Sequence, residues 1–228
     1  MDFNVSNIWL VELFGIQFWI TQTILNTWII MAILVIGALI LRIKLRKMED
    51  TPSGLQNVIE LIVEAFDKLV SSFAGEKAKF VGGWFFTVFL FILVSNFSAL
   101  VGMRPPTADW ATTAALGIST FFLIHVAGSK VRGVGRYFKS FAQPSVLLLP
   151  LNIIGELSRP ISLSFRLFGN ILSGLILMLM VYNLLPVVLR FLLPIPLHLF
   201  FDVFVGALQT FIFCALSLAY IGAACAEE

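Results

Sequence analysis

Charged residues are scarce in this sequence. Asp, Glu, Lys and Arg make up 12% of the 228 residues, whereas a soluble domain carries about 25%. Hydrophobic residues make up 59% of the chain, and its mean hydropathy is +0.98. This composition excludes an ordinary soluble globular domain and indicates a protein of the lipid bilayer.

Residue patterns for metal binding and catalysis are also missing. The only two cysteines, Cys214 and Cys225, lie in the last apolar segment and provide neither a disulfide framework nor a metal spacing. The sequence has no His–Glu metal motif, no nucleophile with a plausible His partner and no phosphate loop. We therefore expect a protein that is not itself an enzyme and that needs no metal or cofactor.

The net charge is only +2, and the basic residues mostly collect beside the apolar segments. This distribution fits membrane topology better than nucleic-acid binding. The first uncharged run lacks the basic start of a signal peptide, so we expect no cleavage there.

Long uncharged runs predict the fold class. Residues 13–41, 80–103 and 203–226 each exceed the roughly 20 residues that a helix needs to span hydrocarbon. A fourth run, residues 110–129, is broken only by His125. We predict an all-α integral membrane protein, a single domain over residues 1–228, with about five transmembrane helices and one amphipathic helix. The expected helices cover about residues 23–41, 53–73 (amphipathic), 80–101, 110–127, 146–184 and 187–224.

Basic clusters predict the orientation of these helices. "RIKLRKMED" follows the first helix and "GSKVRGVGRYFK" follows the third, and Lys and Arg favour the cytoplasmic side of a membrane. The N-terminus is then expected outside and the C-terminus in the cytoplasm. Residues 53–73 alternate apolar and charged side chains at helical spacing, which predicts an amphipathic helix on the cytoplasmic membrane surface.

The last two predicted helices are far longer than a perpendicular span. Apolar segments of this length tilt or kink in a bilayer, and Pro150, Pro160, Pro194 and Pro196 offer positions for kinks. We expect two long, tilted helices that run antiparallel to each other and are joined through "NLLP".

A polar stripe runs along the first of these long helices. Its members are Arg159, Ser162, Arg166, Asn170 and Ser173, which recur at spacings of three, four, four and three residues. Glu156 extends the stripe by one turn toward the N-terminus. The second long helix carries a similar row: Asp202, Gln209, Ser217 and Tyr220. An Arg at the centre of a membrane helix costs about 2.5–3.5 kcal/mol on insertion scales, so such residues usually mark an ion path.

Ordinary pairing is an alternative role for these charges. Arg159 lies three residues after Glu156 and can form a local ion pair with it. Arg166 has no acid within one turn of its own helix, although Asp202 on the partner helix could pair with it. Several small residues beside Arg166 would let another helix come close.

Four further polar residues receive simpler interpretations. We interpret His198 and Arg190, near the hairpin, as headgroup contacts or snorkelling side chains. His125 is interpreted as interfacial, and Asn96 as a hydrogen-bonding partner of a neighbouring helix.

The segment "PISLSFRLFGNILSG" closely resembles the signature of the a subunit of rotary F-type ATP synthases. "ALQTFIF", "NTWIIMAILVIGALIL" and "RPPTAD" resemble other parts of the bacterial form, so the resemblance extends over essentially the whole chain. It implies a stator subunit in the cell membrane of a bacterium, beside a ring of c subunits and the peripheral-stalk b subunits. Two half-channels would connect the ring carboxyls to the two sides of the membrane.

The resemblance also assigns residues to this ion path. Arg166 matches the family's essential Arg, Asn170 its Asn one turn later, and Gln209 its Gln in the last helix. The outer relay departs from the common pattern, because Leu175 and Asp202 stand where the family often has an acid or His. The outer half-channel is therefore expected to use Asp202 and Asp109.

We expect Glu156 and Ser162 to line the cytoplasmic half-channel. Proton translocation coupled to rotation of the c ring is the expected function, and coupling to Na⁺ is the alternative. A stand-alone channel or a secondary transporter is a further alternative, which the absence of an internal repeat disfavours.

Overall fold

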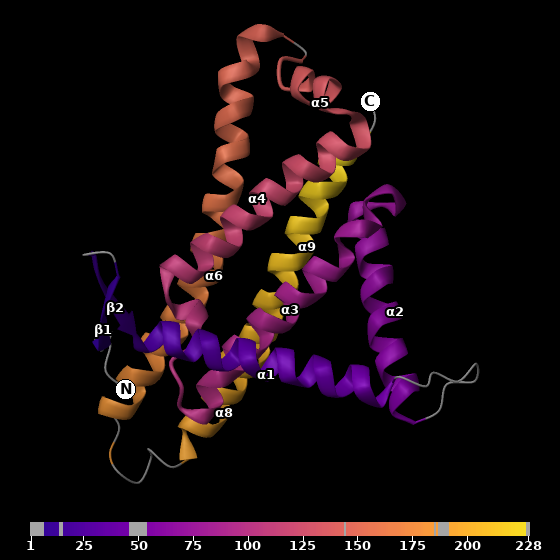
Figure 1. Cartoon of the computed structure of the whole chain (residues 1–228). Coiled ribbons are helices and arrows are strands. Elements are labelled where there is room, and N and C mark those ends of the chain that lie inside the picture. Colours follow the sequence, from indigo (N-terminus) through magenta and orange to yellow (C-terminus); the bar gives the residue numbers. More distant parts are fainter. Residues whose placement is uncertain are drawn as a thin grey trace.

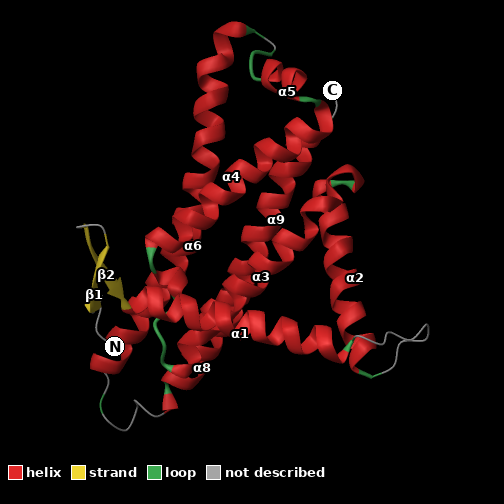
Figure 2. Ribbon diagram, in the orientation of Figure 1, coloured by secondary structure: helices red, strands yellow, loops and turns green. Residues whose placement is uncertain are grey.

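The protein is predominantly helical (Figures 1 and 2). This computed structural model describes residues 7–13, 16–45, 54–143, 145–184, 186 and 192–226. Within this part of the chain, five helical stretches are long and apolar enough to cross a membrane, which confirms the predicted fold class. These stretches are Gln22–Lys44, Glu76–Val101, Trp110–Arg132, Val146–Leu184 and Pro194–Cys225.

Helix bounds differ from the expected ones mostly at the ends. Helices α1 and α4 continue into their basic ends, and α3 is extended by a 3₁₀ turn on each side. The elements are α1 (Gln22–Lys44), α2 (Leu55–Ala74), η1 (Glu76–Val81), α3 (Gly82–Phe97), η2 (Ser98–Val101), η3 (Pro106–Ala108), α4 (Trp110–Arg132), α5 (Val134–Ser140), η4 (Val146–Leu148), α6 (Leu149–Leu184), α8 (Pro194–His198), the π-helical segment η5 (Leu199–Val205) and α9 (Gly206–Cys225).

A small antiparallel hairpin precedes the helices, where the sequence predicted only an interfacial stretch. Strands β1 (Asn7–Leu13) and β2 (Ile16–Thr21) pair with each other, and Thr21 then caps α1 by accepting a hydrogen bond from the Ile24 amide. The two strands are rich in Ile, Trp, Val and Phe, residue types that favour extended backbone.

Helix α2 is amphipathic, as predicted. Phe66, Val70 and Ala74 are buried, whereas Leu61 and Ile62 lie on an exposed apolar surface. The C-terminal end of α2 packs against α9 so closely that a side chain at Gly222 would collide with the Phe73 carbonyl. One side of α2 thus joins the helical bundle, and the rest of its apolar surface is left uncovered within the described chain.

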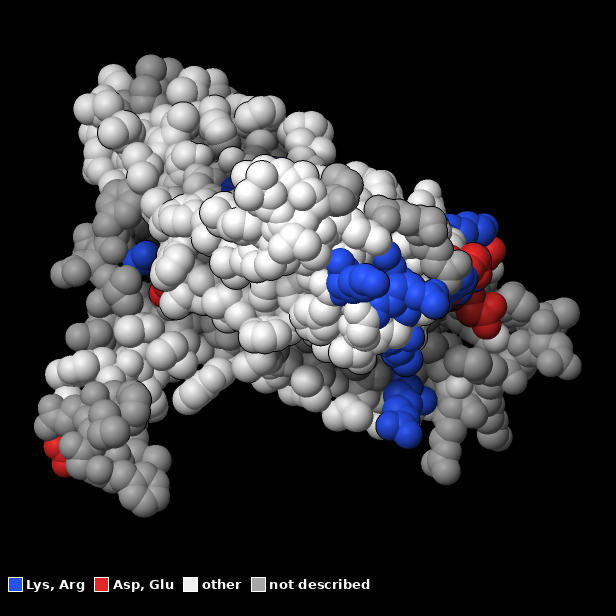
Figure 3. All heavy atoms as spheres, turned by 90° about the horizontal axis from the view of Figure 1, so that it is seen from above, with Lys and Arg blue, Asp and Glu red and all other residues white. Residues whose placement is uncertain are grey.

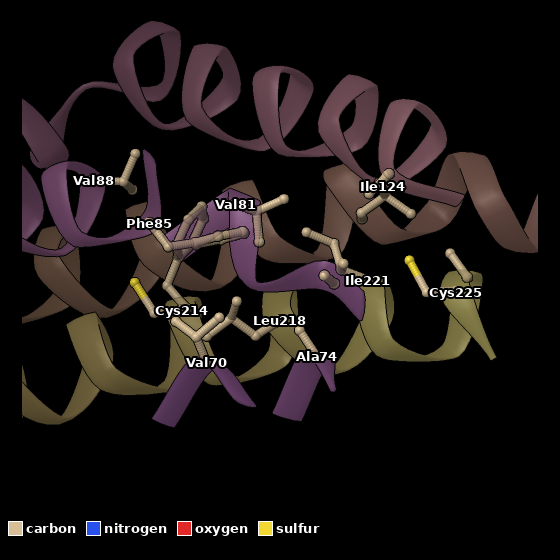
Figure 4. Close-up of a cluster of buried hydrophobic side chains, with 14 of the residues drawn as sticks. Val70, Ala74, Val81, Phe85, Val88, Ile124, Cys214, Leu218, Ile221 and Cys225 are labelled. Carbon is tan, nitrogen blue, oxygen red and sulfur yellow. The ribbon is translucent and has the colours of Figure 1, made fainter. Parts of the chain in front are cut away.

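The core lies around α9, which packs against α4, α2 and α3. Figure 4 shows Phe85 of α3 close to Cys214 and Leu218 of α9, with Val70 of α2 beside them, while Ile124 of α4 lies toward Ile221 and Cys225. Phe85, Cys214 and Leu218 are fully buried. Helix α4 also packs along α6, which contributes Leu163 and Leu167 to the same core.

Helices α6 and α9 run antiparallel to each other, and both are steeply inclined to α1 in the view of Figure 1. Helix α6 continues past Pro160, although proline cannot donate the usual helical hydrogen bond. The second long helix was expected to begin near residue 187, and its described part begins at Pro194. Arg190 lies outside the described residues.

Basic side chains cluster on the molecular surface. Lys130 and Arg132 end α4, and Arg136 and Lys139 follow in α5. Figure 3 shows Lys and Arg side chains gathered on one part of the face that it presents, while most of that face is uncharged.

Candidate functional site

The polar stripe of α6 lies on the outside of the bundle. Ser162, Arg166, Asn170 and Ser173 are all exposed, because the intervening Leu163, Leu167 and Ile171 turn inward and are buried. Helical spacing thus divides α6 into an inner apolar side and an outer polar side.

Arg166 has no acidic partner within the described part of the chain. The alternative ion pair with Asp202 is not formed, since Asp202 contacts His198 instead. An exposed guanidinium on a membrane-length helix faces lipid, water or another protein, and lipid is the unfavourable choice.

One turn beyond Arg166, the two long helices are joined by their amides. Asn170 Nδ2 donates a hydrogen bond of 2.6 Å to Oε1 of Gln209 on α9. Gln209 is only 2% exposed, and its Nε2 has no hydrogen-bond partner among the described residues. A buried unsatisfied donor costs about 1–3 kcal/mol, so an added polar group or water at this position would be stabilising.

A second polar cluster lies where α6 ends and the second long helix begins. His198 Nδ1 lies 2.5 Å from Asp202 Oδ2, and His198 Nε2 lies 2.9 Å from the Tyr182 hydroxyl. All three side chains line a hollow of about 420 Å³. Leu175 lines the same hollow, and it contributes only apolar surface.

Near the opposite end of α6, Glu156 and Arg159 form the local ion pair that their spacing allowed. Arg159 donates to Glu156 across 2.8 Å, and its guanidinium lies 5.0 Å from the centre of the Tyr220 ring on α9. Both charged residues line a cavity of about 400 Å³ together with Arg132 and Asn152. The polar groups at this end therefore surround a space that water can enter.

The remaining predicted site residues have separate positions. Asp109 caps α4, where its carboxylate accepts a hydrogen bond of 3.0 Å from the Ala111 amide. It does not line the hollow around Asp202. Cys214 and Cys225 are buried free thiols, and the residues described here include no group of three His, Cys, Asp or Glu that could hold a metal.

Sequence reasoning missed two members of the Asp202 cluster. His198 had been interpreted as a headgroup contact, although its spacing of four residues from Asp202 was a signal for a helical pair. Tyr182 gave no such signal, because its contact with His198 depends on how the two long helices meet.

The fold and this arrangement define a class: a multi-pass α-helical membrane protein with ionisable groups placed along two long antiparallel helices. The family model for the ATP synthase A chain matches residues 24–222. The chain therefore belongs to the ATP synthase A chain family, and it is a subunit of the ion-translocating membrane sector of ATP synthase.

Individual relatives agree with this assignment. The chain is 38% identical over 203 residues to ATP synthase subunit a of Moorella thermoacetica, which covers 89% of both proteins. It is 37% identical over 217 residues to the chloroplastic subunit a of Stigeoclonium helveticum, covering 88% of this chain and 83% of that protein. It is 33% identical over 218 residues to a Propionigenium modestum protein named as a sodium ion specific subunit a, covering 89% and 73%.

Proposed function

We propose that Arg166 is the stator charge that meets a membrane-embedded carboxyl of a rotating c ring and thereby couples proton translocation to ATP synthesis. The observation that carries the proposal is the exposure of Arg166 on α6 without an acidic partner in the described chain. A charge in this position is stabilised when a second subunit supplies the missing carboxylate.

The charge of Arg166 accounts for one cycle of protonation and deprotonation of a ring carboxyl. A ring carboxyl that faces lipid is neutral, because a bare charge in hydrocarbon is too unfavourable. Beside Arg166 the carboxylate becomes the favoured form, and its proton leaves. Arginine suits this role because it stays protonated and binds carboxylates through two parallel hydrogen bonds. As a fixed cation it also opposes direct passage of an ion between the half-channels.

Two access routes lead toward this charge. Glu156 and Ser162 belong to the cytoplasmic route, which the cavity beside the Glu156–Arg159 pair supports. Asp202 belongs to the outer route, supported by its hollow. Between them, the Asn170–Gln209 hydrogen bond holds the two long helices in register near Arg166. Asp109 acts at most at the rim of the outer route, because its carboxylate caps α4.

The proposed orientation follows from the basic residues. Arg42 and Lys44 end α1, and Lys130 and Arg132 end α4; Lys and Arg favour the cytoplasmic side. The N-terminus is then outside a bacterial cell membrane and the C-terminus in the cytoplasm. The chain carries no catalytic site for nucleotide chemistry in this proposal, and its partners are the c ring and the b subunits of the peripheral stalk.

The test removes the charge in the assembled complex. Arg166→Ala is expected to abolish both ATP synthesis driven by an imposed ion gradient and ATP-driven pumping into liposomes. Arg136→Ala, which removes an exposed guanidinium of α5, is the matched control and is expected to keep both activities.

Coupling at the wild-type level in Arg166→Ala would overturn the proposal. Purification settles the channel alternative: a ring of small hairpin subunits should accompany the chain, whereas a lone ion-conducting oligomer would favour a channel. Pumping by the wild-type complex is expected without added Na⁺. A requirement for Na⁺ would instead favour coupling of the kind that the name of the Propionigenium modestum relative states.

A further inference from the structure

The hollow beside Asp202 contains three groups that can exchange protons. Tyr182 comes from the last turn of α6, His198 from α8 and Asp202 from η5. The other described residues that line the hollow come from the C-terminal third of α6 and from η2 with the glycine after it, and none of them is titratable; they are Ala99, Leu100, Gly102, Leu175, Met178, Leu179 and Asn183. Among the described lining residues, protons can therefore exchange only with Tyr182, His198 and Asp202.

We infer that Tyr182, His198 and Asp202 form the proton relay of the outer half-channel, in which the His198 imidazole passes protons to the Asp202 carboxylate. This inference rests on the proposed function, because it assigns the residues that supply protons toward Arg166. The resemblance to known relatives had pointed to Asp202, and the geometry adds the other two residues.

The contacts of His198 fit such a transfer. A neutral imidazole has one nitrogen that donates and one that accepts, and here each nitrogen lies within hydrogen-bond distance of an oxygen. A proton taken up at Nε2, either from water or from the Tyr182 hydroxyl, which takes a proton back from water, lets the Nδ1 proton pass to Asp202 Oδ2. Asp202 then releases that proton to water nearer Arg166, and exchange with water in the hollow restores the first tautomer. Charge and protons balance without any other reactant.

The proposed relay lies near Gln209 along the chain. Gln209 follows Asp202 by seven positions, which is at most about 10 Å along the helix axis, because the α-helical rise is 1.5 Å per residue and the rise in the π-helical segment is smaller. Gln209 accepts the hydrogen bond from Asn170, which lies one turn from Arg166. The hollow itself is large enough for several water molecules, so water can reach all three side chains of the relay.

The chain contains a natural comparison at the other end of the bundle. His125 Nδ1 lies 2.8 Å from the Tyr137 hydroxyl, which is also a His–Tyr pair, yet no carboxylate hydrogen-bonds to this imidazole in the described structure. A relay needs an acceptor beyond the imidazole, and only His198 has one. His125 is therefore a structural histidine and provides a matched control.

The experiment measures passive proton conduction through the reconstituted complex under a K⁺ diffusion potential. His198→Gln keeps a polar side chain that can still contact Asp202 and Tyr182, but it cannot carry a proton. We expect conduction to fall by about a hundredfold, which is the lower end of the range that proton-transfer groups contribute. His125→Gln is expected to conduct at the wild-type rate, and Asp202→Asn is expected to resemble His198→Gln.

Chemical rescue separates a relay from a structural role. His198→Ala opens space in the hollow, so added imidazole should restore much of its conduction. It should not restore coupling to Arg166→Ala, whose defect lies deeper in the path. Wild-type conduction in His198→Gln would overturn the relay, as would a loss in His198→Ala that imidazole does not repair. Either result would leave the proposed function intact, because that proposal depends on Arg166.

Discussion

The close packing of α4 on α6 gives a prediction whose size can be worked out from the structure. Gly117 of α4 lies against the first half of α6, where an added Cβ would overlap the Ser164 hydroxyl and lie 2.8 Å from the Pro160 carbonyl oxygen. Ser164 is only two residues from Arg166. The glycine therefore sets the distance between α4 and the helix that carries the proposed stator charge.

Gly117→Ala is expected to force these helices apart. An ordinary contact begins near 3.4 Å, so the Pro160 carbonyl must retreat by about 0.6 Å. Overpacking of this kind costs about 1–3 kcal/mol, against a gain of about 1 kcal/mol because alanine is the better helix former. Gly37→Ala of α1 should show the gain alone, since no atom lies within 4 Å of its added Cβ.

Thiol labelling can measure the difference in the purified complex. Cys214 and Cys225 are 0% and 6% exposed, so both become reactive only when the bundle opens. The temperature at which Cys214 and Cys225 become labelled should fall in Gly117→Ala. It should stay level or rise in Gly37→Ala. Adding Ser164→Ala to Gly117→Ala should restore only part of the loss, because the Pro160 carbonyl stays in place. Equal labelling temperatures for the two glycine variants would refute the close packing of α4 on α6.

Two further predictions concern buried polar groups. Asn96 Nδ2 donates to the Gly206 carbonyl at 3.0 Å, and its Oδ1 accepts from the Thr107 hydroxyl at 2.6 Å. Asn96→Ala is therefore expected to destabilise the bundle by about 1–3 kcal/mol. The same labelling assay measures this, and an unchanged labelling temperature would contradict it. Burial raises the pKa of Tyr137 to about 12, so the protonated phenol stabilises the fold below pH 10, and this contribution is lost as pH rises from about 10 to about 12. The difference in tyrosinate absorbance between wild type and Tyr137→Phe should show this late titration, and a titration midpoint near pH 10, the ordinary value, would contradict it.

Much of the fold could be predicted because the bilayer imposes a length on every apolar run. The minimum length of a membrane-spanning helix placed each helix approximately, but it did not predict the exact residues at which the helices begin and end. The third of the five long helical stretches reaches Arg132, beyond the predicted residue 127, because a helix can continue past the hydrocarbon and expose Lys130 to water.

The N-terminal hairpin was missed for a different reason. Its Trp and Phe residues were explained by their preference for the membrane boundary, which accounts for composition and leaves backbone geometry open. The same residue types also favour strands, and two strands can pair only when the chain turns back between them. The segments Asn7–Leu13 and Ile16–Thr21 do so, as their registered pairing shows.

In the candidate site, features that depend on spacing within one helix could be predicted from the sequence, whereas contacts between helices could not. The exposed row through Arg166 and Asn170 follows from helical periodicity, and so does the Glu156–Arg159 pair. The contact between Tyr182 and His198 joins residues from two helices. Their approach depends on the hairpin geometry, which the amino-acid pattern does not encode at any fixed spacing.

A π-helical segment interrupts the row that holds Asp202 and Gln209. At α-helical spacing, residues seven apart share a face, and the sequence therefore placed both side chains in one row. Leu199–Val205 is π-helical, and a π turn closes i to i+5 hydrogen bonds and so takes up more residues. Both side chains nevertheless meet α6: Gln209 is buried and accepts from Asn170, and Asp202 lines the hollow together with Leu175 and Tyr182. Because Asn96 of α3 donates to the carbonyl of Gly206, directly after η5, a neighbouring helix holds the chain at the point where the π-helical segment ends.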